Sequence, residues 1–473
     1  MKRSFATLAL VLISIGTGIP ASAQSCRDLH LVERAEIPST CQQMTMTMKH
    51  DLLDRPYLYV AGKEGGLRIY SLANLQSPAL VRTIPITLLE NLDVMNLEQS
   101  GRYLYLALGN HFTSTQNAGM AVVDLETPAS ASVLDTWVAA GTGGGAGIIT
   151  VEGDHAYLGA MKHGLFVIDI TNRSDIRSIS QFIPDIGYPT PNPNPDLYNA
   201  RGMAVRDGIV YLCYDAGGLR VINVKDPGHP VETGRYSNPM MNGLARAYNN
   251  IVIEDSLAYI AADYCGVEVL NIADTTNIRL HGWWNPYGCP TNNWFSSPVH
   301  ANEIGLDRDC RLLFVSTGKS DLYVLSVSDP AHPDSCASFG GESDGRGSWG
   351  VSIHRDRVFI SYVCAVIPFV SNWTGVKILT YDNECLSAVR QSHTDRQLRL
   401  IVQGDRLHLE NPGVGIESYT VVDILGRMYS ARLIESTAST VSIDIAGLPP
   451  GMYVLSVQSD GLVWRGKFNL PGS

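Results

Sequence analysis

Few residue patterns in this chain match a known catalytic arrangement. The segment 341–345, GESDG, has the spacing of a nucleophile elbow, but that chemistry needs a turn from a strand into a helix under an α/β sheet. The surrounding sequence predicts no such helix. The 12 histidines show no paired ligand spacing and the chain has no Cys-x-x-Cys motif, so no zinc site is predicted. We therefore predict no catalytic residue and no cofactor, and a structural cation such as calcium is the one metal left open.

A second group of residues is suited to binding a ligand. Aromatic rings stack on sugar faces or anchor peptides, and amide and imidazole groups supply directional hydrogen bonds. The candidates of this kind are Trp283, Trp284, Tyr287, Trp294, Phe295, Trp349, His300 and Asn302. The alternative is that the rings only pack long loops onto the rest of the fold.

An internal repeat of about 50 residues indicates which elements position these side chains. A segment typified by GLRVINV occurs seven times, starting at residues 66, 119, 164, 218, 266, 321 and 375. Further apolar, β-branched or aromatic runs flank each copy, with Gly, Asp, Asn and Pro between them. Such alternation is typical of short strands joined by tight turns. Four strands in each of seven units predict an all-β fold, a seven-bladed β-propeller.

The two ends of the repeat region indicate how the ring closes. Residues 31–38, LVERAEIP, look like an outer strand with no unit before it, whereas the seventh unit has only a weak fourth strand. We therefore expect the N-terminal strand to complete the last blade. Closure of this kind removes an exposed strand edge.

The repeats also resemble a known family. The segments GLRVINVKDPGHP from Gly218 and DLYVLSVSDPAHP from Asp321 are similar to the LVIVD repeat, and the resemblance covers roughly residues 27 to 392. It implies a propeller in a secreted bacterial protein. It implies no particular activity, because the family has no general catalytic motif.

The pattern changes after about residue 393. The remaining segments predict a small Ig-like β-sandwich. This stretch resembles the type A sorting domain of the type IX secretion system of Bacteroidetes, and the motif positions are Asn411, Pro412, Asp423, Gly426, Arg427, Gly451 and Tyr453. The resemblance implies translocation by the type IX machinery, removal of this module, and attachment to the cell surface or release.

The N-terminus and the composition agree with export. Residues 1–23 carry Lys2 and Arg3, an apolar run, and the small-x-small pattern Ala21-Ser22-Ala23 of a signal peptide. No later segment is long enough to cross a bilayer. With 46 acidic and 35 basic residues and no basic cluster, nucleic acid is not an expected partner. We predict a signal peptide over 1–23, the propeller over 24–392 and the sorting domain over 393–473, with export through the periplasm to the cell surface or extracellular space.

Loop lengths indicate which face of the propeller binds a partner. Loops that join strand four to the next strand one, and strand two to strand three, share one face because strand one lines the axis. Long segments on this face begin at Gly109, Ile183, Trp283, Gly340 and Cys364, whereas the opposite face has short, uniform turns. The long-loop face is therefore the expected binding face.

Two carboxylates belong to the same face. Asp215 and Asp263 both lie three residues before the repeat glycine, in neighbouring blades. They are candidates to hold a cation or to accept hydrogen bonds from sugar hydroxyls. The alternative is that both are solvated turn residues.

The nine cysteines of an exported chain predict disulfides and one unpaired thiol. From the face of the propeller on which each cysteine falls, we expect the pairs Cys26–Cys385, Cys41–Cys364, Cys265–Cys289 and Cys310–Cys336. Cys213, within a strand, is then the buried free thiol.

These features support two functional hypotheses. The preferred one is a secreted or cell-surface binding propeller without enzymatic activity that engages a glycan or an extracellular protein through the long-loop face. The alternative is an extracellular polysaccharide hydrolase or lyase with its site at the mouth of the central channel. Converging carboxylates or a His-Tyr-Arg cluster would favour catalysis, since the fold alone hosts both kinds of function.

Overall fold

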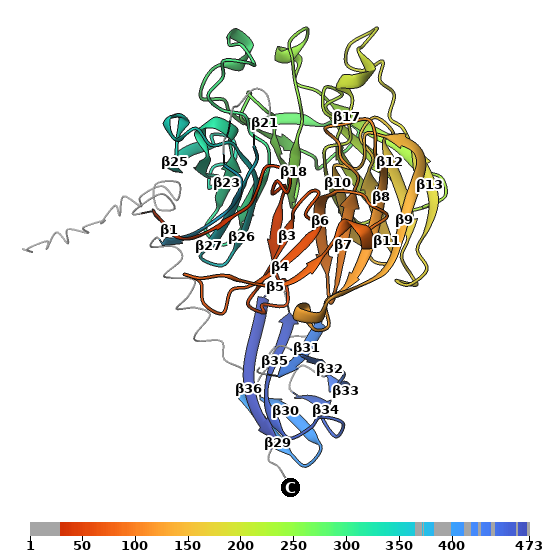
Figure 1. Cartoon of the computed structure of the whole chain (residues 1–473), viewed down its shortest axis with the longest axis vertical. Helices are drawn as coiled ribbons and strands as arrows, with labels where there is room; N and C mark the ends of the chain where they lie inside the picture. The colour runs from red at the N-terminus through yellow and green to blue at the C-terminus, as the bar shows by residue number, and fades with distance from the viewer. Residues whose placement is uncertain are drawn as a thin grey trace, which may run out of the picture.

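A computed structural model describes residues 29–364, 371, 373–382, 399–410, 418–423, 427–436, 440–459 and 462–470. In these residues, strands β1 to β28 form seven four-stranded antiparallel sheets arranged as the blades of a propeller (Figure 1). The first strands of neighbouring blades lie next to each other all the way round the ring, including β2 beside β26. The ring is therefore closed, and the predicted fold class is confirmed. The proposed signal peptide lies outside the described residues.

Each blade is an antiparallel sheet whose strands follow one another in sequence, apart from the last. The first three blades comprise β2 (Met48–His50), β3 (Tyr57–Ala61), β4 (Leu67–Ser71) and β5 (Ala79–Ile84); β6 (Val94–Ser100), β7 (Tyr103–Leu108), β8 (Asn117–Asp124) and β9 (Ser132–Gly143); and β10 (Ile148–Glu152), β11 (His155–Gly159), β12 (Leu165–Asp169) and β13 (Arg177–Phe182). Blades four to six comprise β14 (Gly202–Arg206), β15 (Ile209–Cys213), β16 (Leu219–Asn223) and β17 (Val231–Tyr236); β18 (Asn250–Glu254), β19 (Leu257–Ala261), β20 (Val267–Asn271) and β21 (Arg279–Trp284); and β22 (Ile304–Asp307), β23 (Leu312–Ser316), β24 (Leu322–Ser326) and β25 (Asp334–Phe339).

Blade seven is built from both ends of the propeller. It contains β26 (Ser348–His354), β27 (Arg357–Tyr362) and β28 (Gly375–Asp382), and its outermost strand is β1 (His30–Pro38). β1 pairs with β28 along its length, from His30 opposite Asp382 to Pro38 opposite Gly375. The strand predicted over residues 31–38 therefore supplies the fourth strand of the last blade.

Short 3-10 helices lie in the connections between strands. They are η1 (Ile86–Leu88), η2 (Pro128–Ser130), η3 (Pro195–Leu197), η4 (Pro239–Met241), η5 (Cys289–Thr291), η6 (Gly318–Ser320) and η7 (Glu342–Asp344).

The repeat glycine marks a left-handed turn between the second and third strands. Gly218 has φ 74°, and a Cβ there would lie only 2.2 Å from the carbonyl oxygen of Tyr236. Glycine is favoured because it adopts positive φ without a steric penalty. Asp321 fills the same position in blade six with φ 57°, where Gly340 leaves room for its carboxylate.

The core lies between adjacent blades. For example, Val221 and Leu219 of blade four pack with Ile260 and Ala258 of blade five in one buried cluster. Apolar side chains therefore cover both faces of each central strand, which explains the nearly continuous hydrophobic runs in the sequence.

The long connections lie on one face, as the sequence indicated. Segments 183–201, 237–249 and 285–303 each join a fourth strand to the next first strand. All three project from the propeller at the top of Figure 1. On the opposite face, the described connections within a blade are short turns such as 170–176 and 224–230.

The C-terminal strands form two further sheets. One contains β29 (Arg399–Gln403), β30 (Arg406–Glu410), β34 (Thr440–Asp444) and β33 (Arg432–Ser436), and the other contains β32 (Met428–Tyr429), β31 (Ser418–Asp423), β35 (Gly451–Ser459) and β36 (Leu462–Leu470). Buried residues of both sheets, such as Leu407, Val441 and Leu455, form one core. This is the arrangement expected for a small β-sandwich.

The sorting motif residues that are described have structural roles. Arg427 donates from Nε to Asp423 Oδ2 (2.8 Å), and its backbone N–H donates to Oδ1 (3.0 Å). The hydroxyl of buried Tyr453 donates to the carbonyl oxygen of Pro449 (2.6 Å). Asn411, Pro412 and Gly426 lie outside the described residues. None of the helices in the described part of the chain is long and apolar enough to span a membrane.

Candidate functional site

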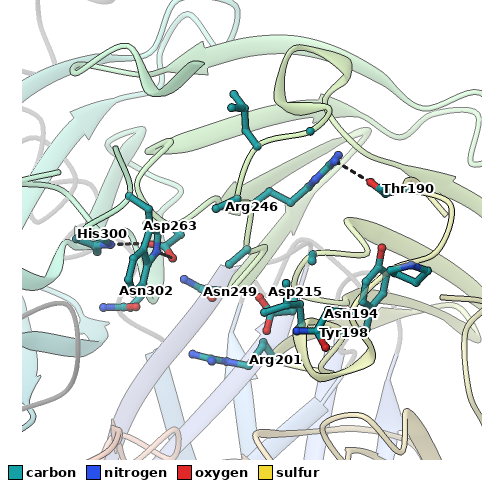
Figure 2. Close-up of a pocket in the computed structure, with 18 of the residues that line it drawn as sticks. Thr190, Asn194, Tyr198, Arg201, Asp215, Arg246, Asn249, Asp263, His300 and Asn302 are labelled. Atoms are coloured by element: carbon teal, nitrogen blue, oxygen red, sulfur yellow. Dashed lines mark hydrogen bonds and ion pairs between the residues drawn. The ribbon is translucent and has the colours of Figure 1, made fainter. Parts of the chain in front are cut away.

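A cavity of about 650 Å³ opens on the long-loop face, where blades four to six meet the mouth of the central channel (Figure 2). Its walls come mainly from the three long connections. The lining residues are Phe112, Thr190, Pro193, Asn194, Leu197, Tyr198, Arg201, Asp215, Ala216, Gly243, Leu244, Ala245, Arg246, Ala247, Asn249, Asp263, Trp294, His300, Asn302 and Trp349. We call this cavity the mouth pocket.

One repeat position places two carboxylates in the mouth pocket. Asp215 and Asp263 follow the second strands of blades four and five and have φ 50° and 46°. Each forms an isolated antiparallel bridge to the next blade, Asp215 with Tyr248 and Asp263 with Ala301. This backbone bridge fixes both residues at the rim of the channel, and Asp263 is only 9% exposed. Asp263 is therefore not a solvated turn residue, whereas Asp215 is only partly buried.

A second repeat position supplies three more lining residues. The backbone N–H groups of Arg201, Asn249 and Asn302 donate to the carbonyl oxygens that close the second strand of the same blade, those of Cys213, Ala261 and Ser316. The two asparagines also connect neighbouring blades, because Asn249 Nδ2 donates to Ala301 (2.9 Å) and Asn302 Nδ2 donates to Ser348 (3.2 Å).

Arg201 forms the floor of the mouth pocket together with residues from across the ring. Its guanidinium carbon lies 5.4 Å from the centre of the Trp349 ring, which belongs to blade seven. Phe112, from blade two, packs edge-on against Trp349 at 5.7 Å. Side chains from three blades thus meet over the channel.

Trp294 and His300 surround the carboxylate of Asp263. The indole Nε1 of Trp294 donates to Asp263 Oδ2 (2.8 Å), and His300 Nδ1 lies 2.6 Å from Oδ1. The Trp294 ring meets the imidazole edge to face at 5.6 Å. Both carboxylate oxygens thus have protein partners, and His300 is only 1% exposed. The three side chains hold one another in place and form one wall of the pocket.

Asp215 is less constrained. Asn199 Nδ2 donates to its Oδ2 (3.0 Å), and no other hydrogen bond to its side chain occurs among the described residues. Burial raises the pKa of Asp215 to about 6, with a smaller contribution from Asp263, while Arg201 and Asn199 act in the opposite direction. Asp215 therefore changes charge in the mildly acidic range.

Buried polar side chains hold two of the long loops in place. Arg220 donates from Nη2 to the carbonyl oxygens of Asp185 and Tyr188, both at 2.9 Å. Glu268, at the equivalent repeat position of blade five, accepts hydrogen bonds from Asn238 Nδ2 (2.8 Å) and from the Tyr248 hydroxyl. Each side chain thus satisfies buried hydrogen-bonding groups of a long loop.

The third long loop is fixed by a disulfide. Cys265–Cys289 joins segment 285–303 to the turn between β19 and β20, with a Cα–Cα distance of 5.0 Å. The sulfur of buried Met241, from the neighbouring loop, lies 3.3 Å from Cys289 Sγ. The loops that wall the pocket are therefore mutually packed.

The structure brings together six of the predicted ligand-binding residues. Those that line the mouth pocket are Trp294, Trp349, His300, Asn302, Asp215 and Asp263. Four others lie outside it. Trp284 is buried against Tyr323 in the core, Trp283 donates from Nε1 to the Cys265 carbonyl (2.9 Å), Tyr287 is exposed, and Phe295 is 61% exposed.

Sequence reasoning did not find Arg201, Asn249, Tyr198 or Arg246. The first two were detectable, because they occupy the same repeat position as Asn302, directly before the inner strand. Tyr198 and Arg246 lie in long loops that have no counterpart in the other blades, so no repeat comparison could indicate them.

Two of the predicted disulfides are confirmed, Cys41–Cys364 and Cys265–Cys289. Cys310 and Cys336 are each disulfide-bonded. Cys26–Cys385 lies outside the described residues. Cys213 is a buried free cysteine, and burial raises the pKa of its thiol.

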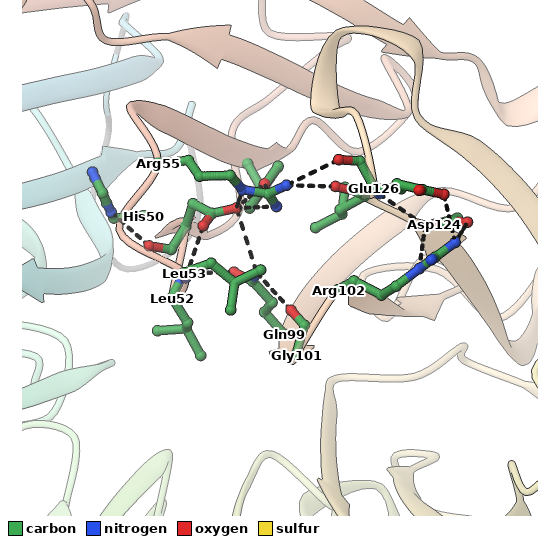
Figure 3. A network of polar contacts seen from close by, with 12 residues as sticks. His50, Leu52, Leu53, Arg55, Gln99, Gly101, Arg102, Asp124 and Glu126 are labelled. Carbon is green, nitrogen blue, oxygen red and sulfur yellow. Dashed lines mark hydrogen bonds and ion pairs between the residues drawn. The ribbon is translucent and has the colours of Figure 1, made fainter. Parts of the chain in front are cut away.

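The opposite face carries a buried network of polar side chains (Figure 3). Arg55 donates to Asp51 Oδ2 from Nε (3.1 Å) and Nη2 (2.6 Å), and to the Leu125 carbonyl from Nη1 (2.7 Å). The Tyr59 hydroxyl also donates to Asp51. Asp51, Arg55 and Tyr59 are buried, so this network connects blades one and two.

The described residues contain no group of three or more His, Cys, Asp or Glu side chains arranged to hold a metal ion.

The fold and the site define a class of protein, a closed seven-bladed propeller with one elaborated face and a separate C-terminal sandwich. Family models assign its parts. The LVIVD repeat matches residues 143–181 and 199–238, and the secretion system C-terminal sorting domain matches residues 405–469. The chain thus carries LVIVD repeats and a type IX secretion sorting domain, which indicates export to the cell surface or extracellular space.

Comparison with solved structures supports the fold alone. A chain of the crystal structure of the mitotic checkpoint complex superposes with a TM-score of 0.50 at 10% identity, covering 81% of this chain and 99% of that one. Saccharomyces cerevisiae Sqt1 superposes with a TM-score of 0.47 at 8% identity, covering 93% and 99%. No curated protein matches this sequence.

Proposed function

We propose that this exported propeller is a binding protein that takes up an extracellular glycan in the mouth pocket. The observation that carries this proposal is a cavity of about 650 Å³ lined by both aromatic and hydrogen-bonding side chains. Trp349 and Trp294 are partly exposed and offer ring surfaces, and amides and carboxylates lie between them. Pockets of this size and composition are typical of small-ligand sites, and rings with directional polar groups suit a sugar.

A glycan fits this site better than a folded protein partner does. Stable protein interfaces bury about 800 Å² on each partner over a broad surface. The polar residues here instead face into a recess at the centre of the ring, below the three long loops. A saccharide chain end or a side branch can enter such a recess.

The arrangement also favours binding over glycoside hydrolysis. Hydrolysis commonly uses two carboxyl groups on either side of the bond. In the mouth pocket, Asp263 has both oxygens engaged by Trp294 and His300, which leaves Asp215 as the carboxylate with a free acceptor among the described residues. One observation favours the catalytic alternative: the pKa of Asp215 is about 6, in the range useful for a general acid.

The test is a screen of the purified mature protein against a panel of polysaccharides, scoring retention and product release together. We expect retention of at least one glycan, and we expect Trp349→Ala to weaken it about tenfold, as the loss of one stacking ring does. Trp137→Ala is the matched control, because Trp137 packs on Phe166 in the wall of the propeller, away from the pocket.

The outcomes separate the hypotheses once thermal melting shows that both variants fold. Retention that Trp349→Ala weakens and Trp137→Ala does not supports the proposal. Absence of retention of any glycan overturns it, as does equal retention by the two variants. Product release that disappears in Asp215→Asn while retention remains would replace it with the catalytic alternative.

A further inference from the structure

The mouth pocket holds two arginines whose surroundings differ. Arg246 donates to Ser237 Oγ, and it reaches Asn242 Oδ1 and Thr190 Oγ1, each at 3.4 Å (Figure 2). Arg201 has no side-chain hydrogen bond or ion pair within the described residues, and its guanidinium lies over the ring of Trp349. In the view of Figure 2, Asn249 lies between the two arginines.

The position of Arg201 in the repeat shows that its side chain does not connect blades. At the equivalent positions, Asn249 and Asn302 donate to the backbone of the next blade. Arg201 makes no such bond and extends over the channel instead. A structural role of the kind that the asparagines fulfil does not explain this guanidinium.

The stacking geometry leaves the donors of Arg201 available. A guanidinium that lies on an aromatic ring uses its face, while its five N–H groups point outward in its plane. These groups match the oxygens of a carboxylate or a sulfate, and charge-assisted bonds of this type are roughly twice as strong as neutral ones. The pocket thus presents an unpaired cation in a chain whose formal net charge is −11.

We infer that the mouth pocket selects saccharides that carry an anionic group, a carboxylate or a sulfate, and that Arg201 pairs with this group. The inference rests on the proposed glycan-binding function and names the class of glycan. Trp349 then has two roles, since it supports the guanidinium of Arg201 and offers a ring surface to the sugar.

Asp215 is the charged group that opposes this pairing. It interacts electrostatically with Arg201, with Asp263 and with the amide of Asn199, but its carboxylate forms no ion pair with Arg201. An anionic ligand therefore reaches Arg201 without first displacing a salt bridge.

The experiment compares pairs of polymers that differ only in charge. The probes are polygalacturonate against its fully methyl-esterified form, and dextran sulfate against dextran, with binding measured by affinity electrophoresis and calorimetry. We expect at least one charged member to bind about tenfold or more tightly than its neutral partner, the effect of a charge-assisted bond. We expect Arg201→Gln to remove this preference. Preference for polygalacturonate assigns a carboxylate, and preference for dextran sulfate assigns a sulfate.

Arg279→Gln is the matched control, because Arg279 is an exposed residue of the outer strand β21. It should keep the preference of the wild type. Equal binding of charged and neutral polymers by the wild type overturns the inference and leaves the proposed function intact, provided that Trp349→Ala still weakens both. Charge preference that persists in Arg201→Gln also overturns it. If that variant fails to fold, Arg201→Lys replaces it. Lysine keeps the charge but lacks the planar pair of N–H donors, so this variant must show a reduced preference for the charged polymer.

Discussion

Arg201 and Trp349 belong to blades four and seven, yet the guanidinium carbon of one lies 5.4 Å from the ring centre of the other. The contact therefore spans the mouth of the central channel. A second contact also joins two blades that are not neighbours. The Thr47 hydroxyl of blade one donates to Glu303 Oε2 of blade six (3.0 Å). Arg201 and Trp349 both line the mouth pocket on the long-loop face.

Binding of an anionic saccharide should strengthen as the pH falls from 7.5 to 5. The pKa of Asp215 is about 6, so its carboxylate is charged at pH 7.5 and repels an anion at Arg201. Protonation removes this repulsion, and we expect an affinity gain of about tenfold. Calorimetry with polygalacturonate or dextran sulfate at pH 5, 6 and 7.5 measures it.

Asp215→Asn supplies the control for this pH dependence. The variant lacks the titrating group, so its affinity should stay nearly constant over the same range and match that of the wild type at pH 5. A variant with the same pH profile as the wild type would show that another group titrates. Further titratable groups at the pocket are His300, Asp263, Tyr198 and Arg246, and His111 packs against Trp349.

The fold was predictable from the sequence because the repeat pattern has a direct physical cause. The repeat glycines Gly66, Gly164, Gly218 and Gly266 have positive φ at one turn, and each central strand is covered by apolar residues from both neighbouring blades. Even Asp321, which replaces the glycine in blade six, keeps a positive φ of 57°. Ring closure by β1 followed from the missing outer strand of the last unit.

The site was only partly predictable, because burial separates residues of the same type. Trp284 and Trp294 lie in one aromatic-rich segment, but the end of a fourth strand directs Trp284 into the core, whereas Trp294 bonds to Asp263 at the pocket. Arg201 follows a loop with no counterpart in other blades. Its importance depends on Trp349, which is distant in sequence and meets it only in the closed ring.

Removal of the Cys265–Cys289 disulfide should weaken ligand binding more than it disturbs the propeller. The bridge spans 24 residues, and loop entropy assigns such a bridge about 3 kcal/mol of stability. In the Cys265→Ser, Cys289→Ser double variant, we expect a lower Tm and weaker glycan retention, since segment 285–303 carries Trp294 and His300. Differential scanning calorimetry and the retention assay measure the two effects.

The matched control is the Cys310→Ser, Cys336→Ser double variant, which alters two disulfide-bonded cysteines of blade six. These residues lie away from the mouth pocket, so Tm should fall while retention stays at the wild-type level. Loss of retention in both variants would mean that the effect on binding is only a consequence of lower stability.

The Cys41–Cys364 disulfide should contribute more to global stability than any bridge within a blade. It joins residues separated by 323 positions and lies where the first and last blades meet. Loop entropy gives a value of about 6 kcal/mol, at the upper end of what such bridges contribute. The Cys41→Ser, Cys364→Ser double variant should therefore unfold at a lower denaturant concentration than the variant without Cys265–Cys289. Equal midpoints would contradict this role in ring closure.

Glu268 should make the propeller less stable at high pH. The side chain is fully buried, and burial raises its pKa from 4.5 to about 7, although the hydrogen bonds from Tyr248 and Asn238 favour the charged form. Because the folded protein binds this proton more tightly than the unfolded chain does, the stabilising contribution is complete below pH 4.5 and is lost as the pH rises through 7.

Glu268→Gln isolates this effect from the histidines. Burial lowers the pKa of His50 to about 4 and that of His111 to about 3, so these two groups add stability as the pH rises to 6.5 and oppose the trend in the wild type. The variant keeps the shape of the side chain without its charge. Its Tm should equal that of the wild type at pH 5 and exceed it at pH 8. At pH 8 its free energy of unfolding should be larger than that of the wild type by an amount on the order of 1 to 3 kcal/mol. Glu126→Gln, at an exposed position, is the control and should leave the difference in Tm between pH 5 and pH 8 unchanged. If Glu268→Gln also left this difference unchanged, Glu268 would be ionised in the folded protein throughout this range.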